Sequence, residues 1–106
     1  MTWITLFAAA AFEVVWALAL KQSAGFARLG WTALFLAAAA ASMVLLAIAL
    51  RDLPVGTAYA VWTGTGAVGT ALLGMVFLSE PATLMRILPI GLIATGIVWL
   101  AREGAH

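Results

Sequence analysis

Four long apolar runs separated by three short polar segments form the main pattern of this chain. The runs cover residues 3–20, 31–50, 55–78 and 82–101. Helices of these lengths span about 27 to 36 Å at roughly 1.5 Å per residue, and a bilayer has a hydrocarbon core about 30 Å thick. The apolar positions are continuous rather than alternating, which favours helices over the strands of a membrane barrel. The pattern predicts an all-α integral membrane protein with four transmembrane helices in a single domain, residues 1–106.

The three connecting segments read KQSAGFARLG, RDLPVG and SEPATLMR. They combine Gly, Pro and charged residues, which is typical of loops, and none is long enough to form a separate domain. We expect Pro81 in the first turn of the fourth helix, where a missing N–H costs little. Pro89 lies inside that helix and removes one backbone hydrogen bond, so we expect a bend there.

Composition strengthens the membrane assignment. Apolar residues make up 66% of the chain and charged residues 8%, and the mean hydropathy is +1.17, far from the balance of soluble domains. A net charge of +1 gives no indication of a nucleic-acid partner, and the absence of Cys excludes disulfides and thiolate chemistry. No basic segment precedes the first apolar run, so we expect this run to remain in the product rather than act as a secretory leader.

The positive charges at the two ends of the predicted helices are almost equal in number. Lys21, Arg28 and Arg86 fall on one side of the membrane, and Arg51 and Arg102 fall on the other with the terminal amine. The positive-inside bias therefore has little to act on, which predicts dual topology. A chain inserted both ways can pair with its inverted copy as an antiparallel homodimer related by an in-plane pseudo-two-fold axis. The alternative is a parallel dimer oriented by weaker signals.

Glu13 is an acid inside an apolar span. It lies about ten residues into its helix, or roughly 15 Å down, and no basic residue occurs in any apolar run. A charged side chain at the bilayer centre costs about 3 kcal/mol even on lenient scales, so such residues are candidates for function. Protons and a cationic cargo would compete for this carboxylate, and a second copy would supply a second, coupled carboxyl group. The alternative is a neutral Glu that only helps helices to associate.

Four further side chains are candidates to surround Glu13. Trp16 lies three residues after it on the same helical face, and Ser42 is at mid-depth in the second run. Tyr59 and Trp62 form an aromatic and polar face on the third run. These residues offer O–H and N–H donors to carboxylates and aromatic faces to a cation. Simpler explanations remain, since Ser42 could bond the carbonyl four residues earlier and the aromatic residues could serve packing or the interface.

The third run also contains GTGAVG, with Gly64, Gly66 and Gly69. Small residues allow helices to approach closely, and glycines also weaken a helix against bending, so two packings of this helix could give alternating access. Packing alone is the simpler explanation for any one of them. The segment AAAAAS of the second run indicates a close-packing face, and the loop charges, Glu80 and Arg86 among them, are read as solvated.

Three segments together resemble the small multidrug resistance family: AFEVVWALALKQSAGF, SMVLLAIAL and LPVGTAYAVWTGTGAVG. The resemblance spans the whole chain. Glu followed by Trp three residues later, Lys at the end of the first helix, and GTAYAVWTG resemble the guanidinium-exporter branch, often called SugE-like. The polyaromatic-cation branch typically has a small residue at Trp16 and an aromatic residue at Met43. Thr65 departs from the pattern, where a branched aliphatic residue is expected.

The resemblance implies an antiparallel four-helix homodimer in which helices one to three enclose the site and helix four forms the dimer contact. Glu13 would bind cargo and protons, and Trp16 and Ser42 would hydrogen-bond its carboxylate. Tyr59 would act between subunits in coupling, and Trp62 would line the cavity. A planar guanidinium ion meets carboxylates through paired N–H donors, which a quaternary ammonium ion cannot do.

The sequence thus predicts a multi-pass transporter of the bacterial inner membrane, not an enzyme, that exports guanidinium in exchange for protons by alternating access. Its expected partners are its own inverted copy, the lipid bilayer, small cations and protons, with no cofactor and no metal. The nearest alternative exports quaternary ammonium or polyaromatic cations. Less favoured alternatives are a small dual-topology cation channel and a structural subunit whose Glu13 pairs with another protein.

Overall fold

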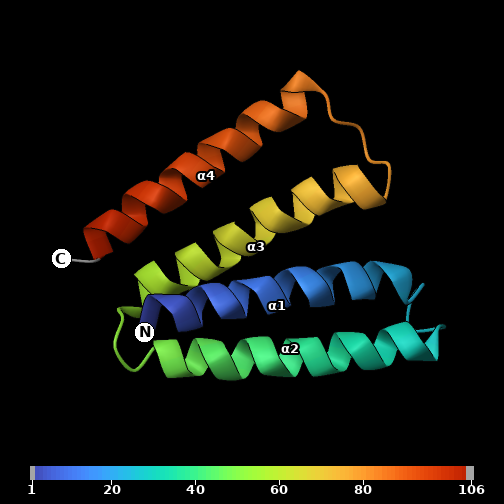
Figure 1. Ribbon diagram of the computed structural model, residues 1–106, viewed down its shortest axis with the longest axis horizontal. Coiled ribbons are helices and arrows are strands. Elements are labelled where there is room, and N and C mark those ends of the chain that lie inside the picture. Colours follow the sequence, from blue (N-terminus) through green and yellow to red (C-terminus); the bar gives the residue numbers. More distant parts are fainter. Residues whose placement is uncertain (1, 105–106) are drawn as a thin grey trace.

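The computed structural model describes residues 2–104, which form four helices in up-and-down order (Figure 1). They are α1 (Thr2–Gln22), α2 (Leu29–Ala49), α3 (Val55–Phe77) and α4 (Leu84–Gly104). Each is long and apolar enough to cross a membrane, and no strand occurs within residues 2–104. The predicted all-α, four-span fold is confirmed, and the chain is a multi-pass membrane protein.

The helices form an open layer rather than a closed bundle. Helix α1 lies between α2 and α3, and α4 contacts only α3 among the described helices (Figure 1). The molecule measures 44 × 34 × 18 Å, so it is less than two helix diameters thick in its shortest direction. None of the described side chains of α4 is buried.

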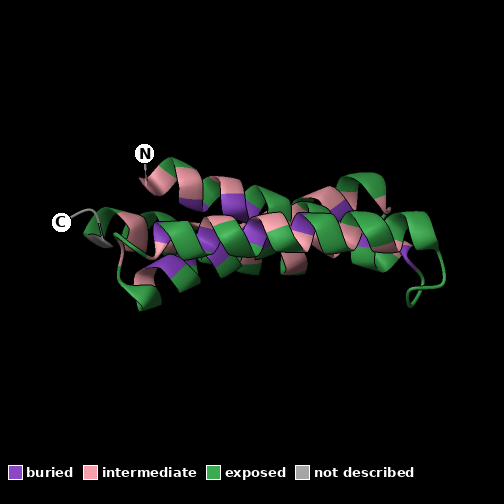
Figure 2. Ribbon diagram, turned by 90° about the horizontal axis from the view of Figure 1, so that it is seen from below, coloured by how far each residue is buried: buried purple, intermediate pink, exposed green. Residues whose placement is uncertain are grey.

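The core lies where α1 meets its two neighbours, and alanine contributes many of its buried residues. Figure 2 shows the buried positions along the helices. Ala9 and Ala10 of α1 and Ala38 of α2 are buried, as is Ala58 of α3. Small side chains let the helix backbones approach closely, which is how membrane helices associate without a hydrophobic driving force. The close-packing face predicted for α2 is therefore present at Ala38 and Ser42.

The connectors lie alternately at the two ends of the layer, as expected for helices that alternate in direction. Thr2 at the start of α1 donates a hydrogen bond to Asp52 of the α2–α3 connector, at 3.1 Å. At the other end, Lys21 and Glu80 line one cavity, which brings together the end of α1 and the α3–α4 connector. Because the helices alternate in direction, Lys21, Arg28 and Arg86 share one end of the layer, as the charge argument assumed.

The start of the fourth helix differs from the prediction. Residues 79–83 are not helical and α4 begins at Leu84, so Pro81 precedes the helix instead of occupying its first turn. The reason is a reversal after α3, where Ser79 has a φ of +56° and the Glu80 N–H donates to the Gly74 carbonyl at 3.3 Å. This turn holds the connector against the end of α3, and residues without regular secondary structure then lead to α4. Pro89 lies inside α4 as expected.

Candidate functional site

Glu13 faces a cavity between α1 and α3, and is only partly buried. The cavity has a volume of about 380 Å³ and is lined largely by small residues. Glu13 Oε1 is inaccessible to solvent and has no hydrogen-bond partner in the described chain. An acceptor buried without a donor is costly, so this oxygen is available to a proton or to a cation that brings its own N–H groups.

The backbone of α3 passes directly beside the Glu13 carboxylate at Gly66. A Cβ built on Gly66 would overlap Glu13 Oε1 and Cδ, so the acid occupies the space that any side chain at 66 would fill. Gly66 is itself buried. The sequence placed Gly66 on a packing or flexible helix, and the structure shows that its missing side chain makes room for the acid.

Ser42 and Trp62 form a buried hydrogen-bonded chain across three helices. The Ser42 hydroxyl donates to the Ala9 carbonyl at 2.6 Å, and the Trp62 indole Nε1 donates to Ser42 Oγ at 3.0 Å. Ser42 therefore bonds neither its own helix nor Glu13. The expected hydrogen bond from Ser42 to the Glu13 carboxylate is not formed, because the single hydroxyl proton is used by Ala9.

The expected bond from Trp16 to Glu13 is not formed either. Trp16 Nε1 is buried and has no partner within residues 2–104. Its ring packs edge-on against Phe35 of α2, with centroids 5.8 Å apart and an interplanar angle of 74°. The same face of α1 thus carries an unused donor three residues from an unused acceptor, which leaves both groups available to a ligand.

Tyr59 lies on the open side of the same aromatic face. Its side chain is 57% exposed, while the ring stands 5.6 Å from that of the buried Trp62. The predicted proximity of these two residues is confirmed. A phenol left open on a membrane helix would be covered by lipid or by a second chain.

The other two glycines of the GTGAVG segment lie at helix contacts. A Cβ at Gly64 would approach Ile97 Cδ1 of α4 at 2.8 Å, and one at Gly69 would approach Val14 Cγ2 of α1 at 2.7 Å. Gly64 and Gly69 therefore face α4 and α1 respectively, at distances that only a missing side chain permits. Their suggested role in bending α3 stays a prediction, since α3 is one continuous helix.

Two charged residues of this cavity were not assigned to the site by sequence reasoning. Lys21 and Glu80 line its outer end, although Glu80 was read as a solvated loop charge. A Cβ at Gly74 would lie 2.5 Å from Glu80 Oε1, so the carboxylate is seated against the bare backbone of α3. The available signal was the spacing of Gly66 and Gly74, eight residues apart and so close to one helical face.

Thr65, the residue that departs from the family pattern, also has an unused polar group. Its Oγ1 is buried without a partner in the described part of the chain. It lines a second, mainly apolar cavity of about 280 Å³ between α3 and α4, together with Gly69 and Ile97.

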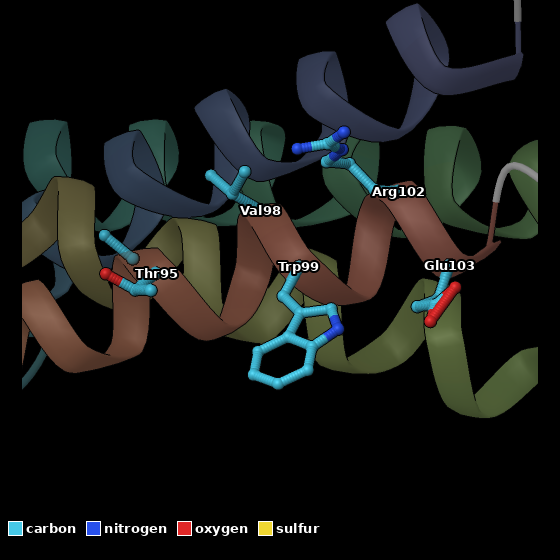
Figure 3. Close-up of a pocket in the computed structure, with 6 residues that line it drawn as sticks. Thr95, Val98, Trp99, Arg102 and Glu103 are labelled. Atoms are coloured by element: carbon cyan, nitrogen blue, oxygen red, sulfur yellow. The ribbon is translucent and has the colours of Figure 1, made fainter.

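A larger hollow of about 700 Å³ lies along the C-terminal half of α4 (Figure 3). The residues that line it all come from this one helix: Ala94, Thr95, Val98, Trp99, Arg102 and Glu103. It is an open helix face with its charges at the helix end, and it contains no acid at mid-depth. The cavity at Glu13 is therefore the candidate site. No group of three or more His, Cys, Asp or Glu side chains suited to a metal ion occurs within residues 2–104.

Comparison with known families identifies the family to which this chain belongs. The model of the family described as Small Multidrug Resistance protein matches residues 1–93. The chain belongs to the Small Multidrug Resistance family. The family assignment suggested by the Glu13, Ser42 and GTAYAVWTG segments is thus confirmed.

Proteins that carry the name Guanidinium exporter are similar to this chain over almost their full length. A protein of Yersinia pseudotuberculosis, named Guanidinium exporter, is 58% identical over 100 residues, covering 94% of this chain and 96% of its own. One of Citrobacter freundii with the same name is 51% identical over 94% of this chain and 95% of its own. One of Salmonella typhimurium strain LT2, also named Guanidinium exporter, is 50% identical over 106 residues and all of both chains.

Proposed function

We propose that this protein exports guanidinium, and small substituted guanidinium ions, from bacterial cells across the inner membrane in exchange for protons. The observation that carries the proposal is the Glu13 carboxylate, half-buried in a cavity with one oxygen that has no donor within residues 2–104. Relatives that are 50% to 58% identical and carry the name Guanidinium exporter support the choice of cargo.

The chemistry of the cavity suits a flat cation with several N–H groups. A carboxylate accepts two parallel N–H bonds from a guanidinium ion, and such charge-assisted pairs are roughly twice as strong as neutral hydrogen bonds. The Trp16 N–H, buried and without a partner within residues 2–104, lies three residues from Glu13 and would orient the carboxylate by donating to it when the cation is bound. The expected role of Trp62 in lining the cavity is not found, because neither Trp16 nor Trp62 is among the residues that line it.

Exchange follows from competition for one group. A protonated Glu13 is neutral and no longer attracts a cation, and a cation on Glu13 disfavours protonation. If the cavity opens alternately to the two sides, a proton entering from outside displaces cargo outward, and cargo entering from inside displaces the proton inward. No covalent step is needed, so the protein acts as a transporter and not as an enzyme.

A second, inverted copy would complete the site. Tyr59 is exposed beside Trp62, and α4 has an apolar face on which none of the described side chains is buried. The balanced charges at the two ends of the layer allow both orientations in one membrane. In the antiparallel homodimer that we propose, two Glu13 carboxyls share the cavity and titrate as a coupled pair.

The test is charge movement in proteoliposomes after a jump in guanidinium concentration, with Glu13→Gln compared to the wild type. We expect transient currents in the wild type and their loss in Glu13→Gln. Asp52→Asn is the matched control, because it removes a carboxylate that lies outside the cavity, beside Thr2. Currents with tetraalkylammonium but not guanidinium would overturn the cargo, and steady flux without proton movement would indicate a channel.

A further inference from the structure

The cavity that contains Glu13 also contains a second carboxylate, at its outer end. The lining extends from Glu13 and Gly66 along α1 and α3 to Lys21, Gly74 and Glu80. Eight residues separate Glu13 from Lys21 and also Gly66 from Gly74, and eight residues of helix rise about 12 Å. The cavity therefore joins the middle of the membrane span to the helix ends, with one acid at each end.

The two acids are seated in the same way on α3. Glu13 lies against Gly66 and Glu80 lies against Gly74, so each carboxylate occupies the place of a missing side chain. Glu80 is held there by its backbone, since its N–H donates to the Gly74 carbonyl at 3.3 Å and Ser79 before it turns the chain with a φ of +56°. The position of Glu80 at the cavity is thus set by the fold rather than by a free loop.

A guanidinium group already binds this second acid. Arg86 Nη2 lies 3.5 Å from Glu80 Oε1, in a pair whose side chains are 40% and 38% exposed. At this length and exposure the pair is weak and readily exchanged, because water competes for both partners. The end group of Arg86 has the same planar N–H geometry as a free guanidinium ion.

We infer that Glu80 is an outer binding residue for guanidinium cations on the path to Glu13, and that Arg86 occupies it until a free cation displaces it. This inference rests on the proposed function for its direction of transport. In the antiparallel pair, one such outer end faces each side of the membrane, so Glu80 serves cargo entry in one copy and cargo release in the other.

The charges near the outer end explain why the carboxylate matters. Lys21 lines the same end of the cavity and Arg86 approaches it, and both are positive. Without Glu80, an entering cation would meet two like charges and no acceptor. Replacing Glu80 by Gln is therefore expected to raise the KM for guanidinium about two- to fivefold, the range of an exposed ion pair, while leaving kcat nearly unchanged.

Binding at Glu80 is tested where the central site has been removed. In Glu13→Gln protein labelled with ¹⁵N in bicelles, guanidinium chloride should shift the amide signals of Gly74 and Glu80 in a saturable manner. Tetramethylammonium chloride at the same ionic strength should not, because it has no N–H donors. The shifts should disappear in the Glu13→Gln/Glu80→Gln protein, whose dispersed spectrum would show that it is folded.

The role of Arg86 is tested with a charge-matched control. On the Glu13→Gln background, Arg86→Gln should tighten guanidinium binding about two- to fivefold, because it removes a competitor for Glu80. Lys21→Gln removes the same charge from the same end of the cavity but no contact with Glu80, so it should tighten binding less. Equal tightening in both variants would overturn the assignment of Arg86 as an occupant.

Other outcomes separate this inference from the proposed function. Suppose that the wild type gives guanidinium currents, but that Gly74 and Glu80 show no saturable shift or shift equally with both cations. This result would overturn the role of Glu80 as an outer binding residue and leave the transport proposal intact. Saturable shifts together with wild-type protein that moves no guanidinium would overturn the proposed function and uphold binding at Glu80.

Discussion

The carboxylate of Glu13 in α1 occupies the position that a Cβ on Gly66 of α3 would take. The acid is thus held at mid-depth without a salt bridge, by a helix whose side chain is missing at that point. This relationship makes the site sensitive to a single methyl group on a helix that does not carry the acid.

We predict that Gly66→Ala lowers guanidinium transport by about five- to 150-fold, because the new methyl forces Glu13 out of its place and overpacking of this kind costs about 1–3 kcal/mol. Gly56→Ala is the matched control. It lies on the same helix, and its Cβ would meet nothing within 4 Å. Transport by Gly66→Ala equal to that of Gly56→Ala would contradict the placement of Glu13 against α3.

The hydrogen-bonded chain from Trp62 through Ser42 to Ala9 predicts coupled stability effects. Ser42→Ala leaves the Trp62 N–H without an acceptor and should destabilise the protein by about 1 kcal/mol, the range measured for such bonds between membrane helices. Trp62→Phe in the same background should cost less than it does alone. The measurement is reversible unfolding in mixed micelles, and strictly additive effects would count against the bond.

Competition between protons and cargo predicts a pH dependence with a defined sign. Acidification protonates Glu13 and removes the charge that attracts the cation, so guanidinium binding should weaken as pH falls. At pH values where the free site is protonated, the apparent Kd for guanidinium should rise about tenfold for each unit by which the pH falls, if one proton competes. For a coupled pair of carboxyl groups the rise should be steeper. Calorimetric titration across pH checks this, and a Kd independent of pH would exclude competition at one group.

Thr65 carries a buried hydroxyl without a partner in residues 2–104, beside the cavity that separates α3 from α4. A buried hydroxyl without a hydrogen bond is costly, so Thr65→Val should stabilise the protein by up to about 1 kcal/mol. Thr95→Val is the contrast, since the Thr95 hydroxyl donates to the Gly91 carbonyl at 2.8 Å. Destabilisation by Thr65→Val would instead indicate that a second copy accepts this hydrogen bond.

Dual topology predicts complementation between variants of opposite charge bias. Arg51→Gln/Arg102→Gln leaves positive charge mainly at one end and should insert in one orientation, whereas Lys21→Gln/Arg28→Gln should insert in the other. Each alone should give little guanidinium resistance, and co-expression should restore it. C-terminal reporter fusions check the orientation, and full resistance from each single variant would argue for a parallel dimer.

The fold could be predicted from the sequence because lipid imposes a strict rule. Every backbone polar group in a span must be satisfied within its own helix, so four apolar runs of about 18 to 24 residues leave few alternatives. The observed helix ends differ from the predicted ones by a few residues, and Pro81 lies before α4 rather than in its first turn. That error arose because Pro81 suits a helix start, while the turn at Ser79 and the bond from Glu80 to Gly74 decided otherwise.

The sequence by itself determined that Glu13 would be the unusual residue, since an acid without a basic partner in an apolar run is expensive wherever the helices pack. It also placed Trp16 on the face of Glu13 and Tyr59 beside Trp62, because residues three apart share a helical face. Each of these predictions concerns residues of one helix and the lipid around it, and both follow from the order of residues in that helix.

Only the tertiary structure decided which helices supply each contact. Three findings depend on contacts between helices or with a connector. Ser42 bonds Ala9 rather than Glu13, and the Glu13 carboxylate lies against Gly66. Glu80 lines the outer end of the same cavity. Such contacts follow from the shapes of packed helix faces and from the turns that join them, and no periodicity along one chain segment records them.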